Sequence, residues 1–202
     1  MTLRIPYDIL GWLSVEDRQN LWQLALRFRC MKLRFPQDVR GWLTLREANK
    51  LLQEATAKTV FEIGTFCGRS AITMAQSAKH VRCIDPFLVC ATTFCDGEHV
   101  YDEFVRNTIR YGVGDKIGVH IGKVQDVAHL LLREFQFGFI DGAHDEGSVL
   151  FDISVAEKIL LPGSRLAFHD YSQHWPEVVR AVDSWRGDRA FTVVDDLIVF
   201  QL

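Results

Sequence analysis

Two acids and two histidines lie in two short segments of the sequence, where their spacing could support acid–base or metal chemistry. Asp141 and His144 stand as Asp-x-x-His, and His169 is followed directly by Asp170. Carboxylate oxygens suit Mg²⁺, whereas imidazole nitrogens suit Mn²⁺, Fe²⁺ or Zn²⁺ better, so these side chains together are able to hold a divalent cation. A histidine whose pKa lies near neutrality can also take a proton from a substrate hydroxyl. The two segments therefore predict a cation site, a catalytic base, or both.

Each histidine also has a purely structural interpretation. His144 would then cap the helix that follows it, and His169 would be a histidine at the edge of the core that is bonded to backbone. We favour a functional role for His144, because its spacing from Asp141 agrees with its expected place at a strand end. For His169 we retain both the functional and the structural interpretation.

A second stretch, FEIGTFCGRS at 61–70, has the glycine spacing of a ligand-binding turn. Gly64 and Gly68 let the backbone turn sharply and approach a ligand, and the helix N-terminus that follows favours a carboxylate. The spacing departs from the G-x-G-x-x-G dinucleotide fingerprint at Phe66, so a pyrophosphate site is disfavoured. Asp85 lies 17 residues beyond Gly68, where its carboxylate can take both hydroxyls of a ribose. The alternative is a structural turn with an N-capping aspartate.

These residues need a scaffold, and from residue 57 the sequence alternates between strand-like and helix-like segments. The strand-like segments are almost entirely apolar, which is typical of parallel strands with helices on both faces. Right-handed crossovers then predict an α/β fold with a doubly wound, Rossmann-like sheet of seven strands. The last two strands are joined too tightly for a crossover, so one of them must run antiparallel. We expect strands over 58–64, 80–87, 116–122, 137–144, 165–171 and twice within 191–202, and helices over 70–80, 96–113, 124–135, 147–161 and 175–186.

A doubly wound sheet binds its ligands at the carboxyl ends of its strands. The polar groups described above all fall at such ends, namely 62–68, Asp85, 122–125, 141–144 and 169–170. Five polar groups on one edge of the sheet predict a single shared site.

The first part of the chain repeats itself once. Residues 1–24 align with residues 31–54 and are identical at 10 of 24 positions, and each copy reads as a short turn followed by an amphipathic helix. Ser14 and Thr44 occupy the N-cap position of the two helices, with acids three residues later. We therefore expect a helical N-terminal extension over 1–55, with repeat units 1–30 and 31–54, and a ligand-binding domain over 56–202. The extension is interpreted as a lid or as an arm that forms a homodimer.

Composition excludes several classes of protein. The net charge of −3 and the lack of a long basic run argue against nucleic-acid binding. No apolar run approaches the ~18 residues of a membrane helix, and the N-terminus lacks the apolar region of a signal peptide. The five cysteines have no metal-finger spacing, so they are interpreted as the reduced thiols of a cytoplasmic protein.

The stretch FEIGTFCGRSAITMA resembles motif I of the class I S-adenosylmethionine (SAM)-dependent methyltransferases. It is closest to the catechol O-methyltransferase-like and antibiotic-sugar O-methyltransferase groups, and the resemblance extends over about residues 40–202, including GWLT…EA, IDGAH…LLPG and FHDY. It implies that Gly64 and Gly68 pass under the methionine end of SAM. The cofactor-binding residues that it implies, with Ser70 at the SAM carboxylate, Asp85 at the ribose and Gln125 at the adenine, are Glu62, Gly64, Phe66, Gly68, Ser70, Asp85 and Gln125.

The same resemblance assigns roles to the acids and histidines. In metal-dependent O-methyltransferases, an acid and an acidic or amide pair hold Mg²⁺, and by position these are Asp141 with His169 and Asp170. His169 departs from this pattern, because the group usually has an acid there. His144 stands where the group carries its general base.

The function implied is a SAM-dependent O-methyltransferase that is assisted by a divalent cation, Mg²⁺ or Mn²⁺, and acts on a small polyhydroxylated acceptor. Two alternatives are a metal-independent SAM methyltransferase that acts on oxygen or nitrogen, and a non-catalytic SAM-binding protein. A nicotinamide oxidoreductase is a more distant alternative because the dinucleotide fingerprint is broken.

Overall fold

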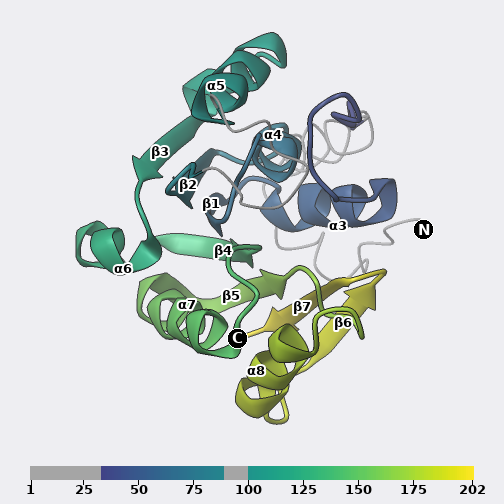
Figure 1. Cartoon of the computed structure of the whole chain (residues 1–202), viewed down its shortest axis with the longest axis vertical. Coiled ribbons are helices and arrows are strands. Elements are labelled where there is room, and N and C mark those ends of the chain that lie inside the picture. Colours follow the sequence, from purple (N-terminus) through teal and green to yellow (C-terminus); the bar gives the residue numbers. More distant parts are fainter. Residues whose placement is uncertain (1–32, 89–99) are drawn as a thin grey trace, which may run out of the picture. The chain divides into compact units, whose positions relative to one another are not determined.

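The computed structural model describes residues 33–88 and 100–202. Figure 1 shows the arrangement of its helices and strands, whose labels are used below. The strands are β1 Thr59–Ile63, β2 His80–Asp85, β3 Ile117–Ile121, β4 Phe135–Ile140, β5 Leu160–Phe168, β6 Phe191–Val194 and β7 Leu197–Gln201. The helices are α3 Leu45–Ala55, α4 Arg69–Ala75, α5 Val100–Arg110, α6 Val124–Val127, α7 Glu146–Ile159 and α8 Pro176–Arg186, with 3₁₀ turns η1 Gly114–Lys116 and η2 Ala128–Leu130.

The strands form one mixed sheet, in the order β3-β2-β1-β4-β5-β7-β6. Strands β1 to β5 run parallel, and β7 is antiparallel to both of its neighbours, β5 and β6. The sheet order starts at β1 and winds outward in both directions, so the prediction of a doubly wound sheet with an antiparallel strand near its end is confirmed. The strand order reverses between β1 and β4, and ligand sites of such sheets lie at this point.

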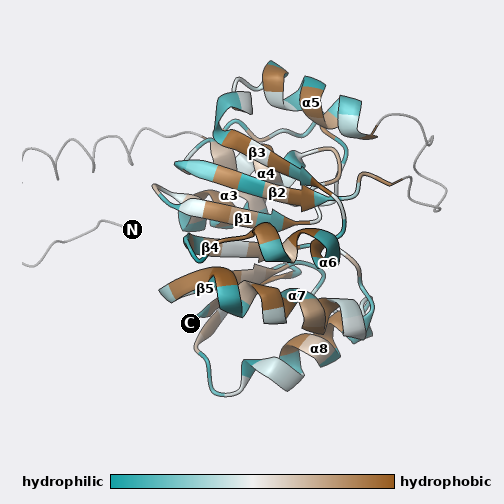
Figure 2. Ribbon diagram, turned by 90° about the vertical axis from the view of Figure 1, so that its left-hand side faces the viewer, coloured by the Kyte–Doolittle hydropathy of each residue, from teal (hydrophilic) through white to brown (hydrophobic). Residues whose placement is uncertain are grey.

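Successive residues of each central strand enter different cores. Val60 belongs to the core under α3, α4 and α5, whereas its neighbour Phe61 belongs to the core under α6, α7 and α8. Figure 1 shows α3 and α4 on one side of the sheet and α6 and α7 on the other, and Figure 2 shows hydrophobic residues along the strands between these layers. Burial on both faces explains why the strands read as almost entirely apolar.

Several predicted boundaries differ from the structure, and two of them show the physical reason. The helix expected over 124–135 is reduced to the single turn of α6 followed by η2, because Phe135 already begins β4. Leu130 and Leu132 in this segment are exposed. The helix expected to end at Pro162-Gly163 ends at Ile159, because Leu160 already pairs with Phe135 of β4.

Helix α3, which the repeat assigned to the extension, packs into the main core. Its residues Ala48, Leu51 and Ala55 are completely buried in the core under α4 and the sheet. Thr44 caps the helix as predicted, since its hydroxyl accepts from the amide of Glu47 and the Glu47 carboxylate accepts from the amide of Thr44.

Residues 33–202 form one compact unit, so the expected boundary at residue 56 falls inside it. The first repeat copy lies outside the described residues. The division into an extension and a domain, and the homodimer, therefore stay predictions. Among the described residues, no helix is long and apolar enough to cross a membrane.

Candidate functional site

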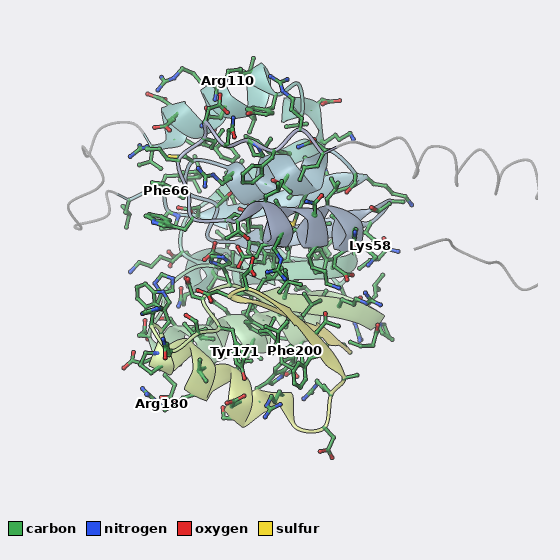
Figure 3. All side chains as sticks on the ribbon, turned by 90° about the vertical axis from the view of Figure 1, so that its right-hand side faces the viewer. Lys58, Phe66, Arg110, Tyr171, Arg180 and Phe200 are labelled. Carbon is green, nitrogen blue, oxygen red and sulfur yellow. The ribbon has the colours of Figure 1, made fainter. Side chains whose placement is uncertain are left out.

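The residues predicted for the site gather at the carboxyl ends of the parallel strands. Phe66 follows β1 and lies at this edge, whereas Lys58, which precedes β1, lies at the opposite edge, as Figure 3 shows. The turn after β1 is joined directly to the loop after β4, because the Asp141 amide donates to the Ile63 carbonyl over 2.8 Å. The glycine turn and the acid–histidine loop are therefore two sides of one site.

Gly64 is required at this junction. Its φ is +82°, and a Cβ there would lie 2.0 Å from the backbone oxygen of Asp141. Gly68, with a φ of +92°, directly precedes α4. Phe66 between them has a φ of +48°, a conformation that non-glycine residues adopt at a cost of about 1–3 kcal/mol and often at functional sites. Its ring stacks on that of Trp42, with a centroid separation of 5.7 Å.

Asp85 holds the glycine turn through its carboxylate. One oxygen accepts from the amides of Thr65 and Phe66 over 2.7 and 2.8 Å, and the other accepts from the amide of Phe87 over 2.6 Å. A carboxylate has about four acceptor positions, so capacity remains for a ribose hydroxyl. Asp85 therefore shapes the turn itself, in addition to the ribose contact predicted for it.

We expect Asp85→Ala to weaken SAM binding by about 1.5–3 kcal/mol, the contribution of hydrogen bonds to a charged group. The loss has two sources, the ribose contact and the loosened turn. Calorimetric titration of the folded variant with SAM measures it. Asp115→Ala, which removes an acid from η1 at the other end of β3, is the matched control and should bind SAM like the parent. Equal affinity of Asp85→Ala and the parent would contradict the ribose assignment.

Glu62 is a buried acid with an unused oxygen. Its Oε2 accepts from the Thr65 hydroxyl over 2.6 Å and from the Cys83 thiol over 3.4 Å, while Oε1 has no partner. Burial raises the pKa of Glu62 to about 7, although hydrogen bonds from Ser70, Thr65 and Cys83 act in the opposite direction. The predicted carboxylate-binding residue Ser70 is itself buried, in the first turn of α4. Gln125, predicted to face adenine, is exposed on α6.

Three of the four acids and histidines form a compact cluster. Ligand atoms of Asp141, His144 and Asp170 all lie within 4.8 Å of one another. The Nε2 atom of His144 lies 2.7 Å from Oδ2 of Asp170, and the imidazole stacks on Trp175 with a centroid separation of 4.1 Å. The hydrogen bond to Asp170 raises the pKa of His144, and burial opposes it only in part. Asp170 and Trp175 thus hold His144 in one orientation.

His169 lies among three carboxylates. It is buried, and its Nδ1 atom lies 3.5 Å from Asp141 and 3.4 Å from Asp170, while Nε2 lies 3.4 Å from Glu47. Burial alone would lower the pKa of His169, but the surrounding carboxylates, Asp141 first, raise it to about 12. The donor atoms that lie within 4.8 Å of one another include His144 and not His169, and the metal-ligand role of His169 stays a prediction.

Two residues of the site were missed by sequence reasoning. Glu47 was identified only as the acid of a capping box, yet its Oε2 also faces His169 and its Oε1 accepts from the Asp196 amide over 3.0 Å. Trp175 was identified only as the start of a helix. The capping-box spacing marks Glu47, but no spacing in the sequence connects it with a histidine 122 residues later.

Comparisons with known proteins agree with this geometry. A family model described as "Methyltransferase domain" matches residues 61–171. Solved structures that resemble the chain include an O-methyltransferase from Bacillus cereus in complex with SAH, with 16% identity, a TM-score of 0.61 and coverage of 95% of this chain and 93% of that one. Another is TomG from Streptomyces achromogenes in complex with SAM, with 17% identity, a TM-score of 0.62 and coverage of 94% and 90%.

The O-methyltransferase NovP has 17% identity and a TM-score of 0.65, with coverage of 78% of this chain and 79% of that one. At these identities the likenesses establish the fold alone. A comparison with curated proteins gave no match.

Proposed function

The chain belongs to the methyltransferase domain family and has the fold of class I SAM-dependent methyltransferases, and from this we propose that it methylates a hydroxyl of a small polyhydroxylated acceptor. The observation that carries the proposal is the His144–Asp170 pair, whose atoms lie 2.7 Å apart beside the glycine turn. An oxygen nucleophile needs its proton removed, and an oriented imidazole is suited to that step.

The residues around the glycine turn fit the methionine end of SAM. Gly64 and Gly68 allow close approach of a ligand to the backbone. The unpartnered Oε1 atom of buried Glu62 would gain a partner from the ammonium group of SAM. Asp85 retains acceptor capacity for the ribose, and Gln125 is exposed for a contact with adenine.

His144 acts as the base in the proposed reaction. With Nε2–H directed at Asp170, its Nδ1 atom accepts the proton of the acceptor hydroxyl. The acceptor oxygen attacks the methyl carbon in line, the carbon–sulfur bond breaks, and the products are a methyl ether and S-adenosylhomocysteine. The carboxylate of Asp170 stabilises the imidazolium that forms, while Trp175 keeps the ring in place.

A cation-assisted form of the reaction is a second candidate, favoured by the cluster of Asp141, His144 and Asp170. Two carboxylates and one imidazole within 4.8 Å fit the donor preferences of Mg²⁺ and Mn²⁺. A cation held there would lower the pKa of the acceptor hydroxyl. His144 would then be a ligand and not a base, so the two roles of this residue exclude each other.

Turnover with and without a chelator separates the two candidates. The enzyme, treated with EDTA and then dialysed, is assayed with labelled SAM against a panel of catechols, glycosides and polyols. We expect methyl ether formation that continues after EDTA treatment, because protonated His169 already supplies positive charge beside both acids. Activity that EDTA abolishes and Mn²⁺ or Mg²⁺ restores would support the cation-assisted form. SAM binding without transfer to any hydroxyl would contradict the proposed function.

A further inference from the structure

A pocket lies at the opposite edge of the sheet from the proposed methyl-transfer site. It encloses about 620 Å³ between α3, the segment before β1, and the first half of β5. Lys58 directly precedes β1 and Gln136 is near the start of β4, so the pocket lies at the amino ends of the strands. Figure 3 shows Lys58 on the far side of the molecule from Phe66.

Three cations in this pocket share a single carboxylate. Buried Glu54 accepts from Lys50 over 2.8 Å and from Arg165 over 2.7 and 2.8 Å, and Lys58 lies 3.8 Å from it. Within residues 33–88 and 100–202, these three side chains have no ion pair with any other carboxylate. One carboxylate balances one of the three positive charges, so the pocket carries an excess of two.

The excess positive charge is partly buried, and an unpaired charge that is shielded from water destabilises the fold. The Lys50 and Lys58 side chains are only 18% and 29% exposed. Burial lowers the pKa of Lys58, and repulsion from Arg165 and Lys50 adds to this, although Glu54 opposes it. A purely structural salt bridge between α3 and the sheet would need only one cation beside Glu54. The other two cations would then be more stable in full contact with water.

We propose that this pocket binds a small dianion, and that a phosphate monoester is the class that it fits. The Nη1 atom of half-exposed Arg165 bonds to Glu54 and its Nε bonds to Gln201, so its Nη2 amino group offers two N–H donors to phosphate oxygens. The ammonium groups of Lys50 and Lys58 supply the remaining charge. The size of the pocket is within the range of small-molecule sites, about 300–1,000 Å³. The amides of Gln53 and Gln136, which line the pocket and are exposed, are available to the organic part of the ligand.

Inorganic phosphate is the probe for the test, with the full chain at pH 8 and saturating SAM to occupy the methyl-transfer site. We expect phosphate to raise the melting temperature and to bind in calorimetry, relative to sodium chloride of equal ionic strength. Lys58→Gln should weaken phosphate binding about tenfold, the lower end for a lost charged hydrogen bond. Lys158→Gln, which removes an exposed cation outside the pocket, should leave it unchanged.

Unaltered SAM affinity shows that the Lys58→Gln variant is folded, because Lys58 lies on the opposite edge from the SAM site. Two results would overturn the proposal. One is a melting temperature that responds equally to phosphate and to sodium chloride. The other is equal weakening of phosphate binding by Lys58→Gln and Lys158→Gln, which would indicate nonspecific attraction to the surface.

Discussion

Replacement of His144 by alanine is expected to lower kcat by about 10²–10⁴, the contribution of a positioned proton acceptor. SAM affinity should stay close to that of the parent, because the imidazole contacts Asp170 and Trp175 and not the glycine turn. Single-turnover kinetics with labelled SAM measure the methyl-transfer step directly. His174→Ala is the matched control, since this exposed histidine lies one residue before Trp175 and should be dispensable.

The pH dependence of kcat/KM gives this prediction a second readout. A base must be neutral to accept a proton. The value of kcat/KM should therefore rise with pH as the His144 imidazolium loses its proton. Because Asp170 raises the pKa of His144, the midpoint should lie above the ordinary histidine value of about 6.5. Asp170→Asn should move the midpoint to lower pH, and His144→Ala should remove this limb. A limb that persists unchanged in His144→Ala would rule out His144 as the base.

The edge on which the site forms could be predicted because parallel strands carry their ligands at one end. Asp85, Asp141 and Asp170 each follow a strand that reads as apolar in the sequence, and the topology brings these strands together in the order β2-β1-β4-β5. The local sequence pattern was sufficient here, because each aspartate can be placed at the edge of the sheet once the end of its own strand is recognised.

The pairing of side chains within the site could not be predicted in this way. Asp170 faces His144 with one oxygen and His169 with the other, and this pairing depends on side-chain rotamers and on what lies behind each ring. His169 turns toward Glu47 because α3 brings a buried carboxylate to that side of β5. The position of α3 depends on long-range packing of Leu51 and Ala55, which helical spacing alone does not specify.

The short α6 shows a similar limit. The apolar residues of 124–135 fit a helical period, but Glu134 donates its amide to the Ile159 carbonyl and Phe135 enters the sheet. The pairing of Phe135 with Leu160 therefore overrides the helical preference of the local sequence.

The second large effect is expected for Gly64→Ala at the glycine turn. The free energy of unfolding of this variant should fall by about 4 kcal/mol or more. Two penalties add there. A positive φ costs a non-glycine residue about 1–2 kcal/mol, and the new Cβ would lie 2.0 Å from the Asp141 carbonyl oxygen, a backbone atom that cannot rotate away. Relief would require β1 and β4 to separate at the point where the Asp141 amide bonds to Ile63.

Gly112→Ala separates the two penalties. Gly112 also has a positive φ, +69°, but a Cβ there would meet no atom within 4 Å. Urea unfolding should therefore give a loss of only about 1–2 kcal/mol for Gly112→Ala, and the difference between the variants measures the contact between the β1 turn and the β4 loop. Gly64→Ala that still folds should also turn over slowly, because displacement of the Asp141 backbone moves the loop that carries His144. Equal losses of stability in the two variants would show that this contact does not hold the two halves of the site together.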